Sequence, residues 1–136
     1  MEAKHFDDLK LKEKIERWDH VVMVLKKLTP HQRRKHWNMS TWGEKTACGT
    51  IACAAGHCGL NSWFRRRGFK LDFNHVKWID SLGLSQDYWN ESLSTDPSDF
   101  FGNQGTSRIF YNDDPRPVSK VIRECETYIK ELKANG

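Results

Sequence analysis

The side chains with the widest range of chemistry lie close together in one uncharged stretch, ACGTIACAAGHCGL at 47–60. This stretch holds three cysteines and a histidine, while the rest of the chain is rich in lysine, arginine and glutamate. Thiols and an imidazole at this density could bind a metal ion or supply a nucleophile. The small residues around them could equally form a tightly packed part of the core.

A metal site needs more ligands than this stretch directs to one point. On a helix, Cys53 and His57 share a face, whereas Cys48 points about 140° away from Cys53. A structural zinc ion takes four ligands, so two more would have to come from elsewhere, such as His75 or Cys125. Cys125 lies in an apolar helical pattern, where a free cysteine acts as a small hydrophobe. We therefore expect no bound metal and no other cofactor.

Cys48 is the candidate nucleophile, because it stands where a helix over 48–59 would begin. A helix N-terminus lowers the pKa of a thiol and offers amide groups as an oxyanion hole. The thiol also needs a histidine base, and His57 would lie about 13 Å further along the helix. His75 or His36 could supply the base, although no spacing requires it. Two interpretations stay open: a hydrolase with Cys48 and His75 as catalytic residues, and an inert buried thiol.

The elements that must position these residues are mainly α-helical and are expected to form one compact domain over 1–136. Apolar residues recur at spacings of three and four over 6–28 and again over 118–132, which predicts two long amphipathic helices. Small residues gather on one side of the segment at about 48–59. This pattern predicts a central helix, with the two long helices packed around it.

The middle of the chain reads as shorter pieces. Asn61 is expected to begin a short helix that Gly68 ends, and further short helices are expected at 74–82 and from Ser85. From about 93 to 117 the composition shifts to serine, aspartate, glycine, asparagine and proline. This shift predicts a long loop, which in a compact domain is usually functional or mobile.

The overall composition is that of an ordinary globular protein. The chain has 136 residues, of which 38% are hydrophobic and 29% charged, and no apolar run is long enough to span a membrane. The first residues carry acids and no apolar core, so no secretory signal is expected. The cytoplasm is the expected compartment, and the four cysteines are expected to be reduced.

Charge is distributed unevenly along the chain. The net charge is only +4, yet HQRRKH at 31–36 and RRRGFK at 65–70 are concentrated basic runs, which favours an anionic partner. Trp37 follows the first run and Trp63 precedes the second. A flat ring beside guanidinium groups can stack a base while the cations hold its phosphates. Long duplex DNA fits less well, because so small a net charge gives few phosphate contacts.

A motif around the cysteines resembles a group of short bacterial and phage proteins with no assigned activity. The shared core is C-G-T-x-x-C-x-A-G-[HW], which here runs from Cys48 to His57 after WNMSTW at 37–42. Looser matches follow at Gly68-Phe69, Leu82-Gly-Leu84, Phe110 and Pro117-Val118. The group often has tryptophan in place of His57, which argues against a metal or base role there. The resemblance implies a phage or mobile-element origin and a bacterial host cell.

Three functions remain as hypotheses. The favoured one is a small phage-type accessory protein, not an enzyme, that binds and sequesters an anionic nucleotide-like ligand such as a host defence signal. The others are the cysteine hydrolase and a protein-binding inhibitor or adaptor; a homo-oligomer stays open. The expected ligand-binding residues are Arg33, Arg34, Arg65, Arg66 and Arg67 for charge, Trp37 and Trp42 for stacking, Thr50 and His57 for hydrogen bonds, and Arg108 as a lid.

Overall fold

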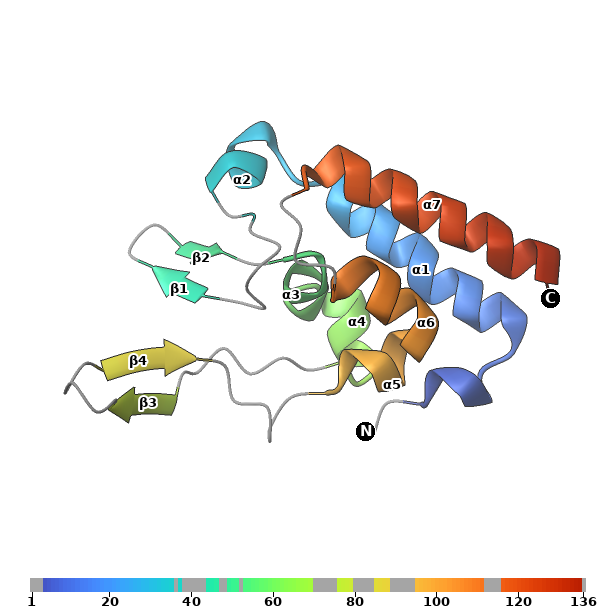
Figure 1. The fold of residues 1–136 in the computed structure, drawn as a ribbon, viewed down its shortest axis with the longest axis horizontal. Coiled ribbons are helices and arrows are strands. Elements are labelled where there is room, and N and C mark those ends of the chain that lie inside the picture. Colours follow the sequence, from blue (N-terminus) through green and yellow to red (C-terminus); the bar gives the residue numbers. More distant parts are fainter. Residues whose placement is uncertain are drawn as a thin grey trace.

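The structure, a computed structural model, describes residues 4–35, 37, 53–69, 95–111 and 116–135, and the backbone of four short strands between them. Helices dominate these residues, so the predicted mainly α fold is confirmed. Two long helices, α1 (Leu11–Lys26) and α7 (Val118–Asn135), lie side by side and run in opposite directions (Figure 1). No helix in the described part of the chain has the length and apolar character that crossing a membrane requires.

The two long helices join through the apolar faces that their sequence periodicity predicts. Trp18, Val21 and Leu25 of α1 are completely buried, and so are Val121 and Cys125 of α7. Polar and charged residues cover the opposite faces, as expected for helices that pack on one side only.

The chain before α1 forms a separate turn rather than the start of the predicted helix over 6–28. This turn, η1 (Phe6–Asp8), is a 3-10 turn whose Phe6 ring is buried. Lys10 has an extended backbone, and α1 begins only at the next residue.

The small-residue helix is shorter than predicted. Helix α3 spans Ala54–Gly59, whereas Gly49–Ile51 forms strand β2, which pairs antiparallel with β1 (Glu44–Thr46). Two of the three β2 residues are branched at Cβ, which favours a strand over a helix. All residues of α3 are buried, as expected for a central helix, and it contacts α1.

A second hairpin replaces the short helices predicted at 74–82 and from Ser85. Strand β3 (Val76–Ile79) pairs antiparallel with β4 (Ser85–Tyr88). In the β3 sequence VKWI every residue except the lysine has a high preference for strands. Antiparallel pairing then satisfies backbone groups that two isolated turns of helix would leave open.

The predicted loop at about 93–117 contains three consecutive helical segments. They are α5 (Pro97–Phe101), α6 (Asn103–Gly105) and the π-helical turn η3 (Thr106–Phe110). Asp96 caps α5 by accepting a hydrogen bond from the amide of Ser98 at 2.9 Å. Aspartate before proline is therefore a helix start here, because proline suits the first helical position.

Two shorter helices are capped by neighbouring side chains, and the first of them begins and ends where its sequence predicts. In α4 (Ser62–Arg66) the Asn61 side chain accepts a hydrogen bond from the amide of Trp63, and Gly68, at φ +91°, follows the helix end. In α2 (Pro30–Lys35) the Thr29 hydroxyl caps the first turn by accepting from the Gln32 amide at 3.2 Å.

Candidate functional site

Two of the predicted ligand-binding arginines, Arg66 at the end of α4 and Arg67 directly after it, line a hollow on the side of α1. Its volume is about 530 Å³, which is in the range of small-ligand sites. The other lining residues are Lys4, Glu13, Glu16, Arg17 and Trp63. Four cations therefore share the hollow with two carboxylates, which leaves a formal excess of two positive charges.

Arg17 is the most unusual residue of the hollow. Its residue surface is only 6% exposed, and its Nη1 donates to the carbonyl oxygens of Lys4 at 3.0 Å and Phe100 at 2.7 Å. Its guanidinium carbon lies 3.8 Å from the centre of the Phe100 ring. Within the described residues no carboxylate forms an ion pair with Arg17. Carbonyl dipoles and a ring therefore hold this cation in place without neutralising its charge.

The electrostatic state of Arg17 reflects this setting. Burial lowers its pKa to about 10, Glu13 raises the pKa, and Arg67 lowers it further. The effect of Arg67 means that the two guanidinium groups repel each other across the hollow. With a pKa of about 10, Arg17 stays protonated at neutral pH, and an anion between the two groups would relieve the repulsion.

Trp63 is covered on both faces of its ring. The His20 ring stacks on it with centroids 3.6 Å apart and planes 12° from parallel. The Arg67 guanidinium carbon also lies 3.6 Å from the Trp63 ring centre. Two groups this close to one centroid cannot share a face, so they take opposite faces. Arg67 is further held by its Nη1, which donates to the Trp63 carbonyl at 3.2 Å, and by Glu16 at 3.9 Å from its Nη2.

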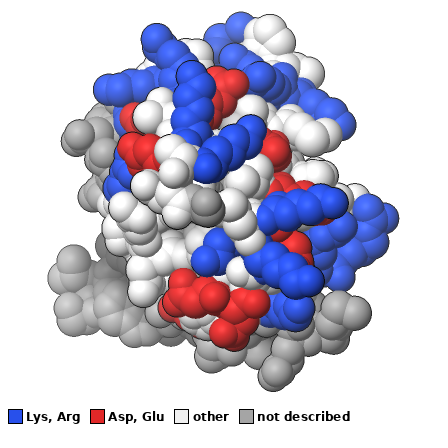
Figure 2. Space-filling view, turned by 90° about the vertical axis from the view of Figure 1, so that its right-hand side faces the viewer, with Lys and Arg blue, Asp and Glu red and all other residues white. Residues whose placement is uncertain are grey.

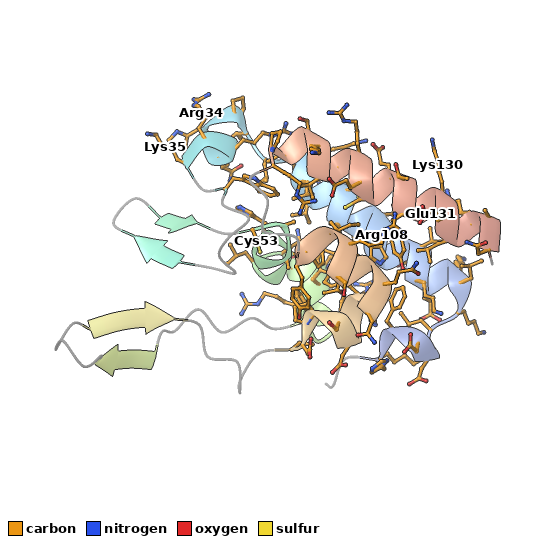
Figure 3. The ribbon with its side chains drawn as sticks, in the orientation of Figure 1. Arg34, Lys35, Cys53, Arg108, Lys130 and Glu131 are labelled. Carbon is orange, nitrogen blue, oxygen red and sulfur yellow. The ribbon has the colours of Figure 1, made fainter. Side chains whose placement is uncertain are left out.

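The basic run on α2 does not contribute to this hollow. Arg33 turns back onto α1, where its Nε donates to the Leu28 carbonyl at 3.1 Å and its Nη2 to the Leu25 carbonyl at 3.3 Å. It thus caps the C-terminal end of α1, and its predicted role in ligand binding stays a prediction. Arg34 and Lys35 are exposed and point outward from α2 (Figure 3).

Trp37 and His57 meet each other, but not at the hollow. Their rings stack with centroids 5.8 Å apart and planes 13° from parallel. The Trp37 indole donates to the Arg116 carbonyl at 2.9 Å, and His57 is only 7% exposed. Both residues therefore join α3 to the segment before α7, and their predicted role in ligand binding stays a prediction.

Several predicted residues cannot be placed in the site. Trp42, Cys48 and His75 lie outside the described residues, and of Thr50 only the strand backbone is described. The hydrolase hypothesis, which needs Cys48 and His75, therefore stays a prediction. Arg65 is exposed on α4 and does not line the hollow, in contrast to the two arginines that follow it.

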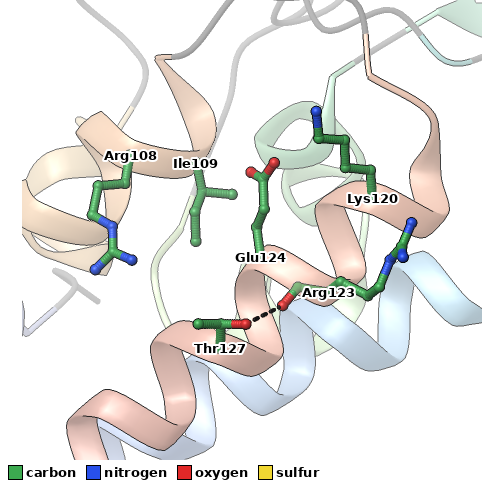
Figure 4. Close-up of a pocket in the computed structure, with 6 residues that line it drawn as sticks. All are labelled: Arg108, Ile109, Lys120, Arg123, Glu124 and Thr127. Atoms are coloured by element: carbon green, nitrogen blue, oxygen red, sulfur yellow. Dashed lines mark hydrogen bonds between the residues drawn. The ribbon is translucent and has the colours of Figure 1, made fainter.

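Arg108 lines a different hollow of about 540 Å³, between η3 and α7 (Figure 4). Its guanidinium binds Glu131 at 2.5 and 3.3 Å, and this hydrogen bonding raises the pKa of Arg108. Lys120 and Arg123 direct their charged ends away from Arg108, and Glu124 extends between η3 and α7. The cations of this hollow therefore do not converge on one anion, and Arg108 lies far from α2 (Figure 3).

Surface charge is mixed on the face where α1 begins and α7 ends. Figure 2 shows lysine and arginine side chains there, with aspartate and glutamate between them. Opposite charges also pair across helices, as in the ion pairs of Arg108 with Glu131 and of Lys26, at the other end of α1, with Glu126. This face offers no continuous basic surface for a long phosphate backbone.

The three described cysteines are buried free thiols. Burial raises the pKa of Cys53 to about 11 and that of Cys125 to about 12, and it raises the pKa of Cys58 well above its ordinary value. Protonated thiols are poor nucleophiles and poor metal ligands. Within the described residues, no three histidine, cysteine or acidic side chains are grouped so that they could hold a metal ion.

We expect the free energy of unfolding to fall as the pH rises above about 9. A thiol whose pKa rises from 9.0 to about 11 on folding stabilises the native state below pH 9, and this contribution is lost as the pH passes 11. For Cys53 alone the loss is about 2 kcal/mol by pH 11. Urea unfolding at both pH values should show a smaller loss in Cys53→Ala. An identical pH dependence of the two proteins would contradict the prediction.

Arg17 is the site residue that the sequence patterns missed. It lies on α1 beside the apolar stripe, four residues before the completely buried Val21. This spacing places Arg17 and Val21 on one side of the helix, at the edge of the buried face. An arginine at such an edge can bury its aliphatic stem. The position of Arg17 next to the apolar stripe is therefore the sequence signal that could have indicated its burial.

The described part of the motif that carries the sequence resemblance, Cys53 to His57, does not line the hollow. No known protein family, no curated protein and no solved structure matches the chain.

Proposed function

We propose that the protein binds a small phosphate-bearing molecule in the hollow between α1 and α4, and holds this ligand without converting it. The supporting observation is Arg17, a buried cation that lines the hollow and lacks an ion-pair partner among the described residues. Sequestration of a nucleotide-like signal, as by a phage accessory protein, is the biological role that we propose for such binding. That role rests on the sequence resemblance.

The charge and geometry of the hollow favour phosphate over a single carboxylate. The lining residues carry an excess of two positive charges, and a phosphate monoester carries nearly two negative charges at neutral pH. Guanidinium groups present planar pairs of donors that match phosphate oxygens. Arg17, Arg66 and Arg67 supply three such groups from two helices.

Arg66→Gln should weaken binding of inorganic pyrophosphate or ADP about tenfold. A hydrogen bond to a charged group contributes roughly 1.5–3 kcal/mol, and the exposure of Arg66 places it at the lower end of that range. Isothermal titration calorimetry at fixed ionic strength measures the effect. A thermal-shift screen with cyclic dinucleotides, ADP-ribose and mononucleotides would identify the preferred ligand.

Arg65→Gln is the matched control. It removes the same charge from the same helix at an exposed position that does not line the hollow. Binding that weakens equally in both variants would show that overall charge, and not the hollow, attracts the ligand. A chain that binds no phosphate compound but retains a host protein in a pull-down would favour the adaptor hypothesis.

A further inference from the structure

We infer that the ligand of this hollow carries a planar aromatic base, which stacks on Trp63 in the place that Arg67 occupies in the free protein. This inference rests on the proposed function and extends it from a phosphate compound to a nucleotide. The structural basis is the arrangement of three side chains, in which Trp63 lies between His20 and Arg67.

The face of Trp63 under Arg67 is the face toward the hollow. Trp63 and Arg67 both line the hollow, whereas His20 does not. The Arg67 guanidinium therefore covers the Trp63 ring on the side of the hollow, with its carbon 3.6 Å from the ring centre. This is the separation of stacked planar groups, so a base would fit where the guanidinium lies.

The opposite face of Trp63 is fixed independently of any ligand. His20 stacks on it within 12° of parallel, and the His20 Nδ1 lies 3.1 Å from the Glu16 carbonyl oxygen one turn earlier in α1. The contact with His20 thus holds the Trp63 indole in position from the face opposite Arg67. The indole therefore stays in place for stacking when Arg67 moves.

Arg67 is held by contacts that a ligand can replace. Its ion pair with Glu16 is long, at 3.9 Å, and both side chains are more than 40% exposed. Ion pairs of this kind contribute little, and so do cation–π contacts at exposed sites. Arg67 also donates one hydrogen bond from its Nη1 to the Trp63 carbonyl at 3.2 Å. A bidentate pair between the guanidinium and a phosphate replaces this bond and is stronger than the other two contacts. Arg67 therefore moves to the phosphate, and the base takes its place on Trp63.

The test compares ligands that share a phosphate or a base. Calorimetry of the full chain with AMP, ribose 5-phosphate and adenosine should show that AMP binds about tenfold more tightly than ribose 5-phosphate. In Arg67→Met, ribose 5-phosphate should bind about tenfold more weakly, because a phosphate contact is lost. Adenosine should bind several-fold more tightly, because no guanidinium has to leave the ring. A purely structural role of Arg67 does not produce this opposite response.

The outcomes separate the inference from the proposed function. Equal affinities for AMP and ribose 5-phosphate in the wild type would overturn the base-stacking inference and leave phosphate binding intact. No binding of pyrophosphate or of any of the three probes would overturn both. Trp63→Leu should reduce AMP binding to the level of ribose 5-phosphate. If that variant does not fold, the wild type and Arg67→Met still decide the question.

Discussion

Trp18→Ala is expected to lower the free energy of unfolding by about 3–5 kcal/mol. The Trp18 side chain is completely buried, and its ring lies 5.2–5.4 Å from the rings of Phe101, Phe110 and Tyr128. Its indole also donates to the Phe101 carbonyl at 3.1 Å. The variant would leave a large cavity between α1, α7 and the segment from α5 to η3, together with an unsatisfied carbonyl.

The measurement is urea unfolding followed by far-UV circular dichroism, which does not depend on tryptophan fluorescence. Domains of this size are stable by about 5–15 kcal/mol, so the variant should be partly unfolded at 37 °C or unfold at far lower urea. Asp19→Ala, at the exposed next position, should change stability by about 0.5 kcal/mol or less. A loss below about 1.5 kcal/mol in Trp18→Ala would mean that the core closes around the missing ring.

The long helices could be predicted because their signals are local and repeated. In α1 and α7 an apolar residue recurs every three or four positions over several turns, and the buried residues follow that pattern. The ends of α4 are equally local, since Asn61 and Gly68 act on the nearest turn. Patterns within a few residues are enough to predict an element when its hydrogen bonds and caps come from residues of the same segment.

The middle of the chain could not be predicted in the same way. The helical projection of 48–59 presupposed a helix, whereas Gly49–Ile51 pairs with a strand that the projection does not include. Pairing between strands is not visible in the periodicity of either one. The composition of 93–117 was equally ambiguous, because residues typical of loops, such as Asp96 and Pro97, are also those that begin helices.

Two of the seven residues that line the hollow were among the predicted site residues. Arg66 and Arg67 stood out as part of a basic run beside an aromatic residue. Arg17 did not, because its setting depends on the Phe100 carbonyl and ring, 83 residues away in the sequence. Arg33 and Trp37 were predicted as site residues too, and their side chains donate hydrogen bonds to backbone carbonyls of the protein itself, away from the hollow. Residue type indicates which contacts are available, and the fold decides which are already satisfied.

Gly102→Ala should lower the free energy of unfolding by about 3 kcal/mol, through two separate effects. Gly102 has φ +88° and ψ 148°, a conformation that is almost exclusive to glycine. A Cβ at this position would also lie 2.5 Å from Cδ1 and 2.7 Å from Cε1 of the buried Phe6 ring. Strain and overpacking therefore add, because relieving one does not relieve the other.

The same substitution should also weaken ligand binding, although Gly102 does not line the hollow. Phe6 lies two residues after Lys4, whose carbonyl accepts the hydrogen bond from Arg17 at 3.0 Å. A displaced Phe6 ring would shift this carbonyl and loosen the edge of the hollow. Urea unfolding and pyrophosphate titration below the melting temperature measure the two effects, with Asn103→Ala, at an exposed position, as the control. If Gly102→Ala proved as stable as the control, the N-terminal segment would be free to move away, and Lys4 could not hold Arg17 in place.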